Sequence, residues 1–248
     1  MIAEMTTIQW VTICISAIFM GMSKTGIQGI TAVTVPFMAM AFGAKESTGI
    51  ILPMLCMADV ISVAYFRKKA DLKTVFRLLP SAVAGFFLAI AVDKQIPAHE
   101  FRMLLGATLL LVFMVMVWSD IKGKENRYSH TWWYAVIFGV LGGFVTMIGN
   151  AAGPVMAIYL MSMRKSKLEF IGTNAWYFMA INLLKVPLQI FVWNNITWET
   201  FQLNLYMLPF LGIGAFLGLS IIGRFSEKTF HRMIQAISLV SVIAMIVK

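Results

Sequence analysis

The stretch TWWYAVIFGVLGGFVTMIGNAAGPVMAIYLMSM, residues 131–163, decides the fold class because it contains no charged residue. A membrane-spanning helix needs roughly 20 mostly apolar residues, so this stretch is too long for one span. Small residues gather near its middle, at Gly142, Gly143, Gly149 and Gly153. We therefore expect a membrane segment that breaks there into two half-helices.

The rest of the chain shares this apolar character. Of its 248 residues, 60% are hydrophobic and only 12% are charged, with a mean hydropathy of +0.83. Soluble domains are nearer half apolar and a quarter charged. A chain of this size could not hide so much apolar surface in one core facing water, which excludes a soluble enzyme, a disordered tail and a disulfide-stapled secreted domain. The composition predicts an all-α membrane protein, a polytopic helical bundle.

Other apolar stretches predict the remaining spans. Single spans are expected at residues 47–66, 74–92, 101–119, 168–193, 201–223 and 229–247. A second long stretch, residues 8–44, is interrupted only by Lys24 and also carries glycines near its middle. Nothing resembling a linker separates these spans, so we expect a single transmembrane domain over residues 1–248.

The basic residues predict which loops face the cytoplasm, since short cytoplasmic loops carry an excess of Lys and Arg. Such clusters occur at residues 67–73, 122–127, 164–167 and 224–232. Residues 131–163 join two of them, so this stretch should enter and leave on the same side as a re-entrant hairpin. By the same reasoning residues 8–44 form a hairpin from the outside, and both termini lie outside. The net charge of +9 thus reflects membrane topology, and we expect no nucleic-acid partner.

This topology divides the chain into two halves of opposite orientation, about residues 1–119 and 131–248. Each half would hold one hairpin, broken at glycines, and three transmembrane helices. Adding 123 carries Gly26 onto Gly149 and Gly49 onto Gly172, and it places Asp59 on Asn182. Such an inverted repeat is common in secondary transporters, whose substrates bind near the bilayer midplane between the repeats.

The two glycine-rich tips are the expected binding site. Non-helical backbone at membrane depth survives only where protein or a watery cavity satisfies its polar groups. Half-helices starting after the tips would direct N–H groups and positive dipole ends to the midplane, which suits an anion. The residues expected there are Thr25, Gly26, Gln28, Gly29, Gly149, Asn150 and Gly153.

Charged and amide side chains inside the spans extend this site. We expect Lys24 to contact the anion, with pairing to Asp59 or extension to the membrane interface as alternatives. Asp59 could pair with a lysine, gate the pathway or bind a coupling proton. The predicted helix at 168–193 adds further candidates, with hydrogen bonding between helices as the alternative role. Asn174 and Lys185 share one face, Asn182 lies near it, and Trp176 belongs to the same helix.

No catalytic or metal-binding motif accompanies these residues. The three histidines, His99, His130 and His231, fall in predicted loops or at helix ends, and Cys14 and Cys56 lie in apolar runs. We therefore expect neither an enzyme nor a cofactor or metal.

The tips also carry the motifs of a known family. Residues 26–36 join a glycine-containing motif to an apolar run and Pro36, residues 149–159 form a degenerate copy, and Gly172 with Thr173 matches a small-residue signature. The chain resembles the sulfite exporter TauE/SafE family of anion permeases, and Gly-Met-Ser-Lys-Thr-Gly at 21–26 resembles its lysine-bearing variant. Gln28 interrupts the usual glycine run, and Tyr159 replaces the closing proline of the second copy.

The resemblance implies export of sulfite or small organosulfonates across the inner membrane of a bacterium. Together with the charge pattern it predicts a secondary transporter, or facilitator, for a small oxyanion in contact with membrane lipid. Anion uptake by proton symport, with Asp59 as proton carrier, and a small-anion channel remain alternatives. The sequence leaves open whether the protein works as a homodimer.

Overall fold

The computed structural model describes residues 4–27, 30–93, 130–150 and 152–247. These residues form helices and connections without a strand, which confirms the predicted all-α membrane fold. The expected span at 101–119 and the basic cluster at 122–127 lie outside the described residues.

The described helices follow the predicted spans closely. They are α1 (Thr7–Thr25), α2 (Thr31–Phe42), α3 (Ala44–Phe66), the short 3₁₀ turn η2 (Arg67–Lys69), α4 (Leu72–Asp93), α6 (Trp132–Gly149), α7 (Gly153–Ser162), α8 (Lys167–Phe191), α9 (Trp198–Tyr206), α10 (Leu208–Arg224) and α11 (Glu227–Val247).

Both long apolar stretches are divided into two helices at their glycine-rich positions. Helix α1 ends at Thr25, directly before Gly26, and α2 begins at Thr31. Helix α6 ends at Gly149, and the next residue, Asn150, has a left-handed φ of 53° that turns the chain out of the helix. Pro154 then stands in the first turn of α7, where its missing N–H costs no hydrogen bond.

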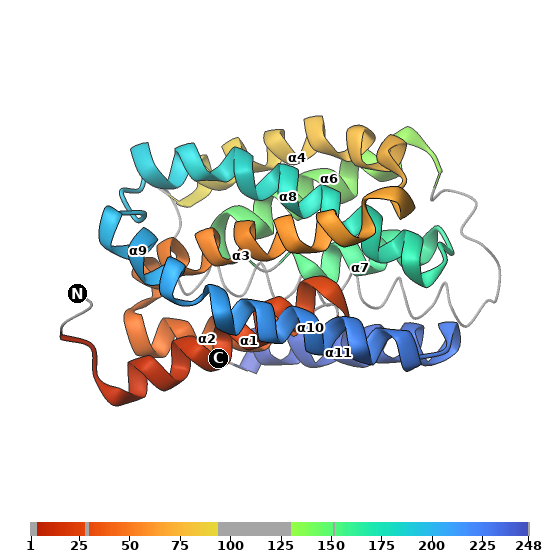
Figure 1. Cartoon of the computed structure of the whole chain (residues 1–248). Coiled ribbons are helices and arrows are strands. Elements are labelled where there is room, and N and C mark those ends of the chain that lie inside the picture. Colours follow the sequence, from red (N-terminus) through yellow and green to blue (C-terminus); the bar gives the residue numbers. More distant parts are fainter. Residues whose placement is uncertain (1–3, 28–29, 94–129, 151, 248) are drawn as a thin grey trace.

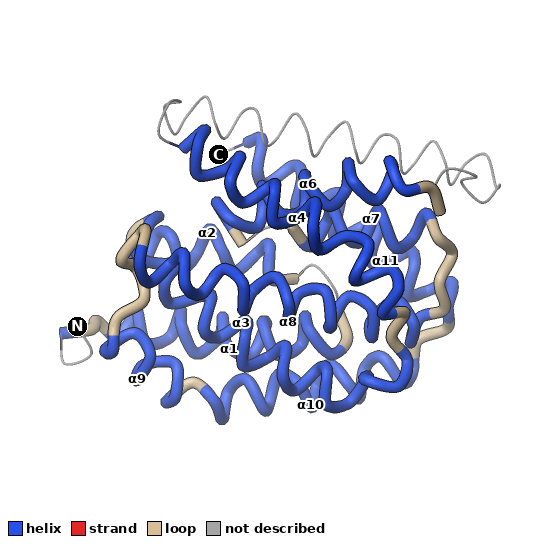
Figure 2. Tube along the Cα trace, turned by 90° about the horizontal axis from the view of Figure 1, so that it is seen from above, coloured by secondary structure: helices blue, strands red, loops and turns tan. Residues whose placement is uncertain are grey.

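Apart from the two tips, connections between the helices lie at the two ends of the bundle (Figure 1). The links α3–α4, α7–α8 and α10–α11, which carry the basic residues, lie at one end, and the start of α1 and the α8–α9 link lie at the other. Viewed from above, α1 packs with α10 on one side of the bundle, and α4 packs with α6 on the other. Helices α3 and α8 lie between these two pairs (Figure 2). The two central helices are the ones that carry most of the buried polar residues discussed below.

Glycine lets the outer pairs approach to backbone contact. On α6, a Cβ atom on Gly143 would overlap the carbonyl of Ala82 in α4. On α10, a Cβ atom on Gly214 would overlap the carbonyl of Ile18 in α1. Small residues are the usual means of close helix packing in lipid. Each outer pair therefore joins a helix of one half to a helix of the other.

The lengths and surfaces of the helices fit a bilayer. Among the described residues, 46–69 and 72–92 are each long and apolar enough to cross a membrane, and α9 with α10 forms a third candidate bent by 50°. The expectation of one helix over residues 201–223 is therefore wrong in detail, because Pro209 starts a new helix after Met207. Large apolar side chains such as Phe191 and Phe216 point outward, as lipid-facing residues do.

Candidate functional site

A buried ion pair marks the end of the first broken helix. Lys24 lies in the last turn of α1, and its Nζ is 2.8 Å from Oδ1 of Asp59 in α3. Both side chains are buried, with exposed fractions of 7% and 0%. A buried charge is costly unless it is paired, so each residue holds the other in place. Lys24 thus adopts the pairing that the sequence left as an alternative to anion contact.

Asn182 extends this pair into the second half of the chain. Its Nδ2 donates a hydrogen bond of 2.7 Å to Oδ2 of Asp59. Asn182 is itself fully buried in α8. The carboxylate of Asp59 is therefore shared between α1 and α8, and α3 connects them.

Two further residues belong to this cluster, and sequence analysis missed both. The ring of Phe178 lies 4.0 Å below Nζ of Lys24, a cation–π contact. The hydroxyl of Ser62 donates a hydrogen bond of 2.6 Å to the backbone carbonyl of Lys24. Phe178 precedes Asn182 by one helical turn and Ser62 follows Asp59 by one, so helical spacing from the polar residues was the available signal.

The second broken helix ends on another lysine. Nζ of the fully buried Lys185 donates to the backbone carbonyl of Thr146 at 2.7 Å and to Oδ1 of Asn150. Free carbonyls give the end of a helix a partial negative charge, and a cation placed there is stabilising. Lys185 therefore caps the C-terminal end of α6 and holds Asn150 in the tip.

These contacts link the two tips through the centre of the bundle. At the first tip, Lys24 forms an ion pair with Asp59 of α3. Asp59 accepts a hydrogen bond from Asn182 of α8. One turn after Asn182, Lys185 donates a hydrogen bond to Asn150 of the second tip. The structure thus brings together five of the predicted site residues. The resulting chain of charges and amides crosses from one half of the protein to the other.

Two other predicted residues attach the first tip to α10. The hydroxyl of Thr25 lies within hydrogen-bonding distance of the carbonyls of Gly21, at 3.0 Å, and Ala215, at 2.9 Å. A Cβ atom on Gly26 would overlap the backbone of Gly218. In this structure both residues serve the packing of α1 on α10.

The remaining predicted residues have simpler positions. Gly149 is the last residue of α6, and Gly153 is the first of α7. Asn174 is buried in α8, and the half-buried Trp176 has a ring N–H with no acceptor among the described residues. Gln28 and Gly29 lie outside the described residues.

Ionic contacts close the basic end of the bundle. Lys165, before α8, lies 2.7 Å from Asp71 of the α3–α4 link and 2.6 Å from Glu169. The backbone N–H of Asp71 donates to Thr173 in α8, and that of Lys167 donates to Glu227 in α11. Burial alone would raise the pKa of Asp71, but hydrogen bonds from Lys165 and Thr74 and the charge of Lys165 outweigh it and lower the pKa to about 2.

Amide and hydroxyl groups close the opposite end. Nδ2 of Asn195, in the α8–α9 link, donates to Oγ1 of Thr48 at 3.1 Å and to Gln189 at 3.1 Å. A Cβ atom on Gly49 of α3 would overlap the carbonyl of Asn195. At the basic end, a Cβ atom on Gly172 of α8 would lie 3.0 Å from the backbone nitrogen of Ala70, a tight but less severe contact. Residues 49 and 172 are the pair that the shift of 123 relates.

Nothing in the described part of the chain suggests metal chemistry. Within residues 4–27, 30–93, 130–150 and 152–247, no group of three His, Cys, Asp or Glu side chains is placed to hold a metal ion. The cluster that links the two tips consists of two lysines, one carboxylate, amides and helix ends.

Broken helices that end on buried charges inside an apolar bundle are the architecture of a membrane transporter. The comparison with family models gives the same answer. The model described as sulfite exporter TauE/SafE matches residues 13–245, so the chain belongs to this family. The protein is therefore a multi-pass membrane transporter and not an enzyme, as predicted. No curated protein and no solved structure matches the chain.

Proposed function

We propose that the protein exports a small oxyanion, sulfite or an organosulfonate, across the inner membrane of a bacterium. The observation that carries the proposal is the buried pair of Lys24 and Asp59 at the end of the first broken helix. An ammonium group held in a dry interior by one carboxylate can exchange that carboxylate for a substrate oxyanion of the same charge. Family membership supports the anionic class of substrate.

In this mechanism the substrate takes the place of Asp59 at Nζ of Lys24. The ring of Phe178 supports the ammonium from below and leaves its other directions to oxygen acceptors. A hydrogen bond to a charged group contributes roughly 1.5–3 kcal/mol net. While Asp59 stays charged and close to Lys24, its carboxylate competes with the substrate, so substrate binding lowers the free energy little. Binding becomes favourable once Asp59 moves away or takes up a proton.

Backbone donors at the tips would complete the site. Among the described residues no side chain caps the first turn of α2 after Ile30 or of α7 after Ala152. The free N–H groups of a helix N-terminus favour an anion. The candidate substrate-binding residues are thus Lys24 with the tip positions Gly26, Gln28, Gly29, Gly149, Asn150 and Gly153.

The closed ends favour a carrier that works by alternating access. Links from both halves meet at each end, through Lys165 and Asp71 at one and through Asn195 and Thr48 at the other. A carrier would open one end at a time around the central helices, and the inverted repeat would make the two openings equivalent. Contacts between the two halves at both ends support the carrier.

The membrane potential alone could drive export. Moving one negative charge out of a negative cytoplasm gains about 2.3 kcal/mol per 100 mV, so no coupling ion is required. The contact between Lys24 and Asp59 also supports a second candidate function, uptake of the anion together with a proton. In that case protonation of Asp59 would free Lys24 for the anion, and a proton and an anion would cross together.

Transport assays with purified protein in liposomes test these proposals. Counterflow of radiolabelled sulfite should be stimulated by unlabelled sulfite on the opposite side, because a carrier exchanges substrate and a channel does not. Equal flux with and without trans substrate would identify a channel. Thermal stabilisation by a panel of anions would rank the substrates, since a ligand that binds the native state raises its stability.

A further inference from the structure

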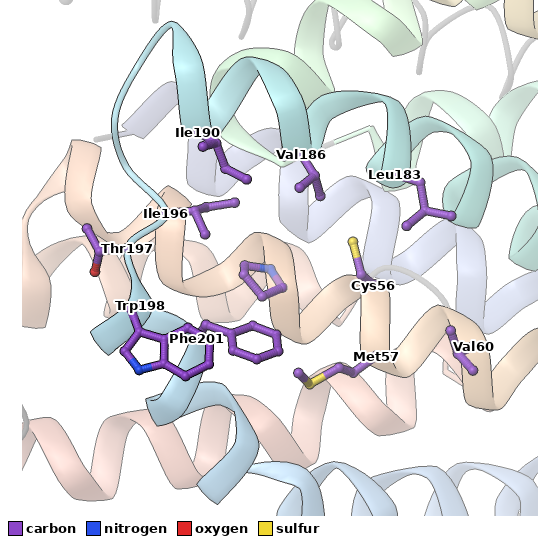
Figure 3. Close-up of a pocket in the computed structure, with 11 residues that line it drawn as sticks. Cys56, Met57, Val60, Leu183, Val186, Ile190, Ile196, Thr197, Trp198 and Phe201 are labelled. Atoms are coloured by element: carbon purple, nitrogen blue, oxygen red, sulfur yellow. The ribbon is translucent and has the colours of Figure 1, made fainter.

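An apolar groove opens on the side of the bundle between α3 and α8 (Figure 3). Its volume is about 550 Å³, within the range of sites for small ligands. One wall comes from α3, through Pro53, Cys56, Met57 and Val60, and the other comes from α8, through Leu183, Val186 and Ile190. Thr197, Trp198 and Phe201 close one end. The groove is separate from the polar cluster, because Asp59, Asn182 and Lys185 are buried and do not line it.

The chemistry of the groove suits a hydrocarbon. Thr197 supplies the one hydroxyl among its lining residues, and no charged side chain lines it. Its rim consists of apolar side chains that lie open to the surroundings, with exposed fractions of 57% for Val60 and 51% for Leu183. In a membrane protein such a rim faces lipid tails, so the groove opens toward the acyl region of the bilayer.

The extent of the groove matches one leaflet. Its inner end lies at Val60 and Leu183, each next in sequence to one of the hydrogen-bonded residues Asp59 and Asn182. The proposed inverted repeat puts that level at the bilayer midplane. Its outer end lies at Trp198, an amphipathic ring of the kind enriched at the membrane interface. From Leu183 to the end of α8 the rise is about 12 Å, close to half of a hydrocarbon core of about 30 Å.

We propose that this groove binds one acyl chain of a phospholipid, from the leaflet on the side of α9. The level of the midplane rests on the proposed function, whereas the groove and its lining do not. The exposed carboxylate of Glu199 beside Trp198 favours a zwitterionic over an anionic headgroup. One wall belongs to each half of the chain. The acyl chain therefore lies between α3 and α8, the two helices that would move relative to each other during transport.

Quenching of Trp198 in detergent tests the proposal. The full chain, stripped of lipid, is titrated with phosphatidylcholine brominated on its acyl chains, and Trp198→Phe identifies the signal of Trp198. We expect quenching that saturates at one lipid per protein. Val186→Phe would fill the groove, and losing about two methylene contacts should weaken binding roughly tenfold. Val192→Phe is the matched control, since Val192 is an exposed valine directly after the end of α8 that does not line the groove.

Cys56→Leu fills the groove from the opposite wall and gives a second variant if Val186→Phe does not fold. The proposal is overturned if quenching of Trp198 never saturates, or if the groove variants and Val192→Phe bind lipid equally. It is also overturned if the groove variants change the oligomeric state instead, because a second copy of the chain would then be the occupant. Lipid binding is measured without transport, so a failed transport assay leaves this result unaffected.

Discussion

Asn182 donates a hydrogen bond of 2.7 Å to the carboxylate of Asp59, although the two residues are 123 positions apart. The same shift carries Gly26 onto Gly149 and Gly49 onto Gly172. Two positions related by a twofold rotation can touch only close to the rotation axis. The proposed inverted repeat therefore has its axis at this hydrogen bond, where α3 and α8 meet.

Removing the charge of Lys24 should weaken anion binding. Lys24→Met keeps the length and apolar character of the side chain, and losing one charged hydrogen bond should lower affinity about 10- to 150-fold. The substitution also leaves Asp59 buried without its cation, which lowers stability. The double variant Lys24→Met, Asp59→Asn removes both charges and should recover the melting temperature but not anion binding. Anion affinity equal to wild type in that stable double variant would place the site elsewhere.

Replacing Asp59 by Asn should separate its two proposed roles. If Asp59 carries a proton, transport by Asp59→Asn loses its pH dependence while anion binding persists, because Lys24 is then freed from its carboxylate. If Asp59 only pairs with Lys24, the main effect is a lower melting temperature. Flux measured in liposomes from pH 5 to pH 8 distinguishes the outcomes, and unchanged pH dependence in a stable variant would rule out proton symport.

The glycine contact between α4 and α6 should tolerate no side chain. Gly143→Ala would drive a methyl group into the carbonyl of Ala82, and such overpacking costs about 1–3 kcal/mol. Gly212→Ala is the control, since a Cβ atom there meets nothing within 4 Å and alanine is the better helix former. Thermal unfolding in detergent should show a loss for the first variant only. Equal melting temperatures would mean that the two helices pack less tightly than described.

The ionic closure at the basic end should weaken in acid. The pKa of Asp71 is about 2, below the ordinary value of about 3.9, so its stabilising contribution is complete above pH 4. It is lost as the pH falls from about 4 toward 2. Asp71→Asn should lower stability by about 0.5–1 kcal/mol at pH 7, as expected for a partly exposed pair, and by almost nothing near pH 2. A difference in melting temperature that stays constant over this range would contradict the pairing of Asp71 with Lys165.

The orientation of the protein can be tested with fusion reporters. We expect residues 1 and 248 outside and residue 126 inside, because the basic links should face the cytoplasm. A reporter that is active in the periplasm at both termini, and in the cytoplasm at residue 126, is the expected result. A cytoplasmic C-terminus would overturn the two-hairpin topology, and a fusion within residues 224–232 provides an internal control.

Much of the fold could be predicted because charge and glycine stand out against an apolar background. Lys24 and Asp59 attracted attention as charges inside spans, and the glycine runs located the helix breaks. The pairing of Lys24 with Asp59 was among the expected alternatives. The contacts made by Ser62, Phe178 and Thr146 could not be predicted, since these are ordinary residues for an apolar helix. Their importance comes from which helices touch, and that is a property of packing.

Lys185 illustrates the same limit. The sequence placed it in a binding site or in hydrogen bonding between helices, and the structure has it on the carbonyl end of α6. That role depends on α6 ending beside α8, which periodicity within either segment does not reveal. The bend between α9 and α10 is different, because Pro209 was present in the sequence as a signal for a helix start.

The crossed pairing of the outer helices has a consequence for biosynthesis. Helix α1 leaves the ribosome first, yet the surface that covers it belongs to α10, near the end of the chain. Contacts so distant in sequence form late and slow the folding of the chain. The first half should wait in the bilayer as an incomplete intermediate, exposed to quality-control proteases, until translation is almost finished. Two halves expressed as separate polypeptides should each be degraded alone and persist only when made together.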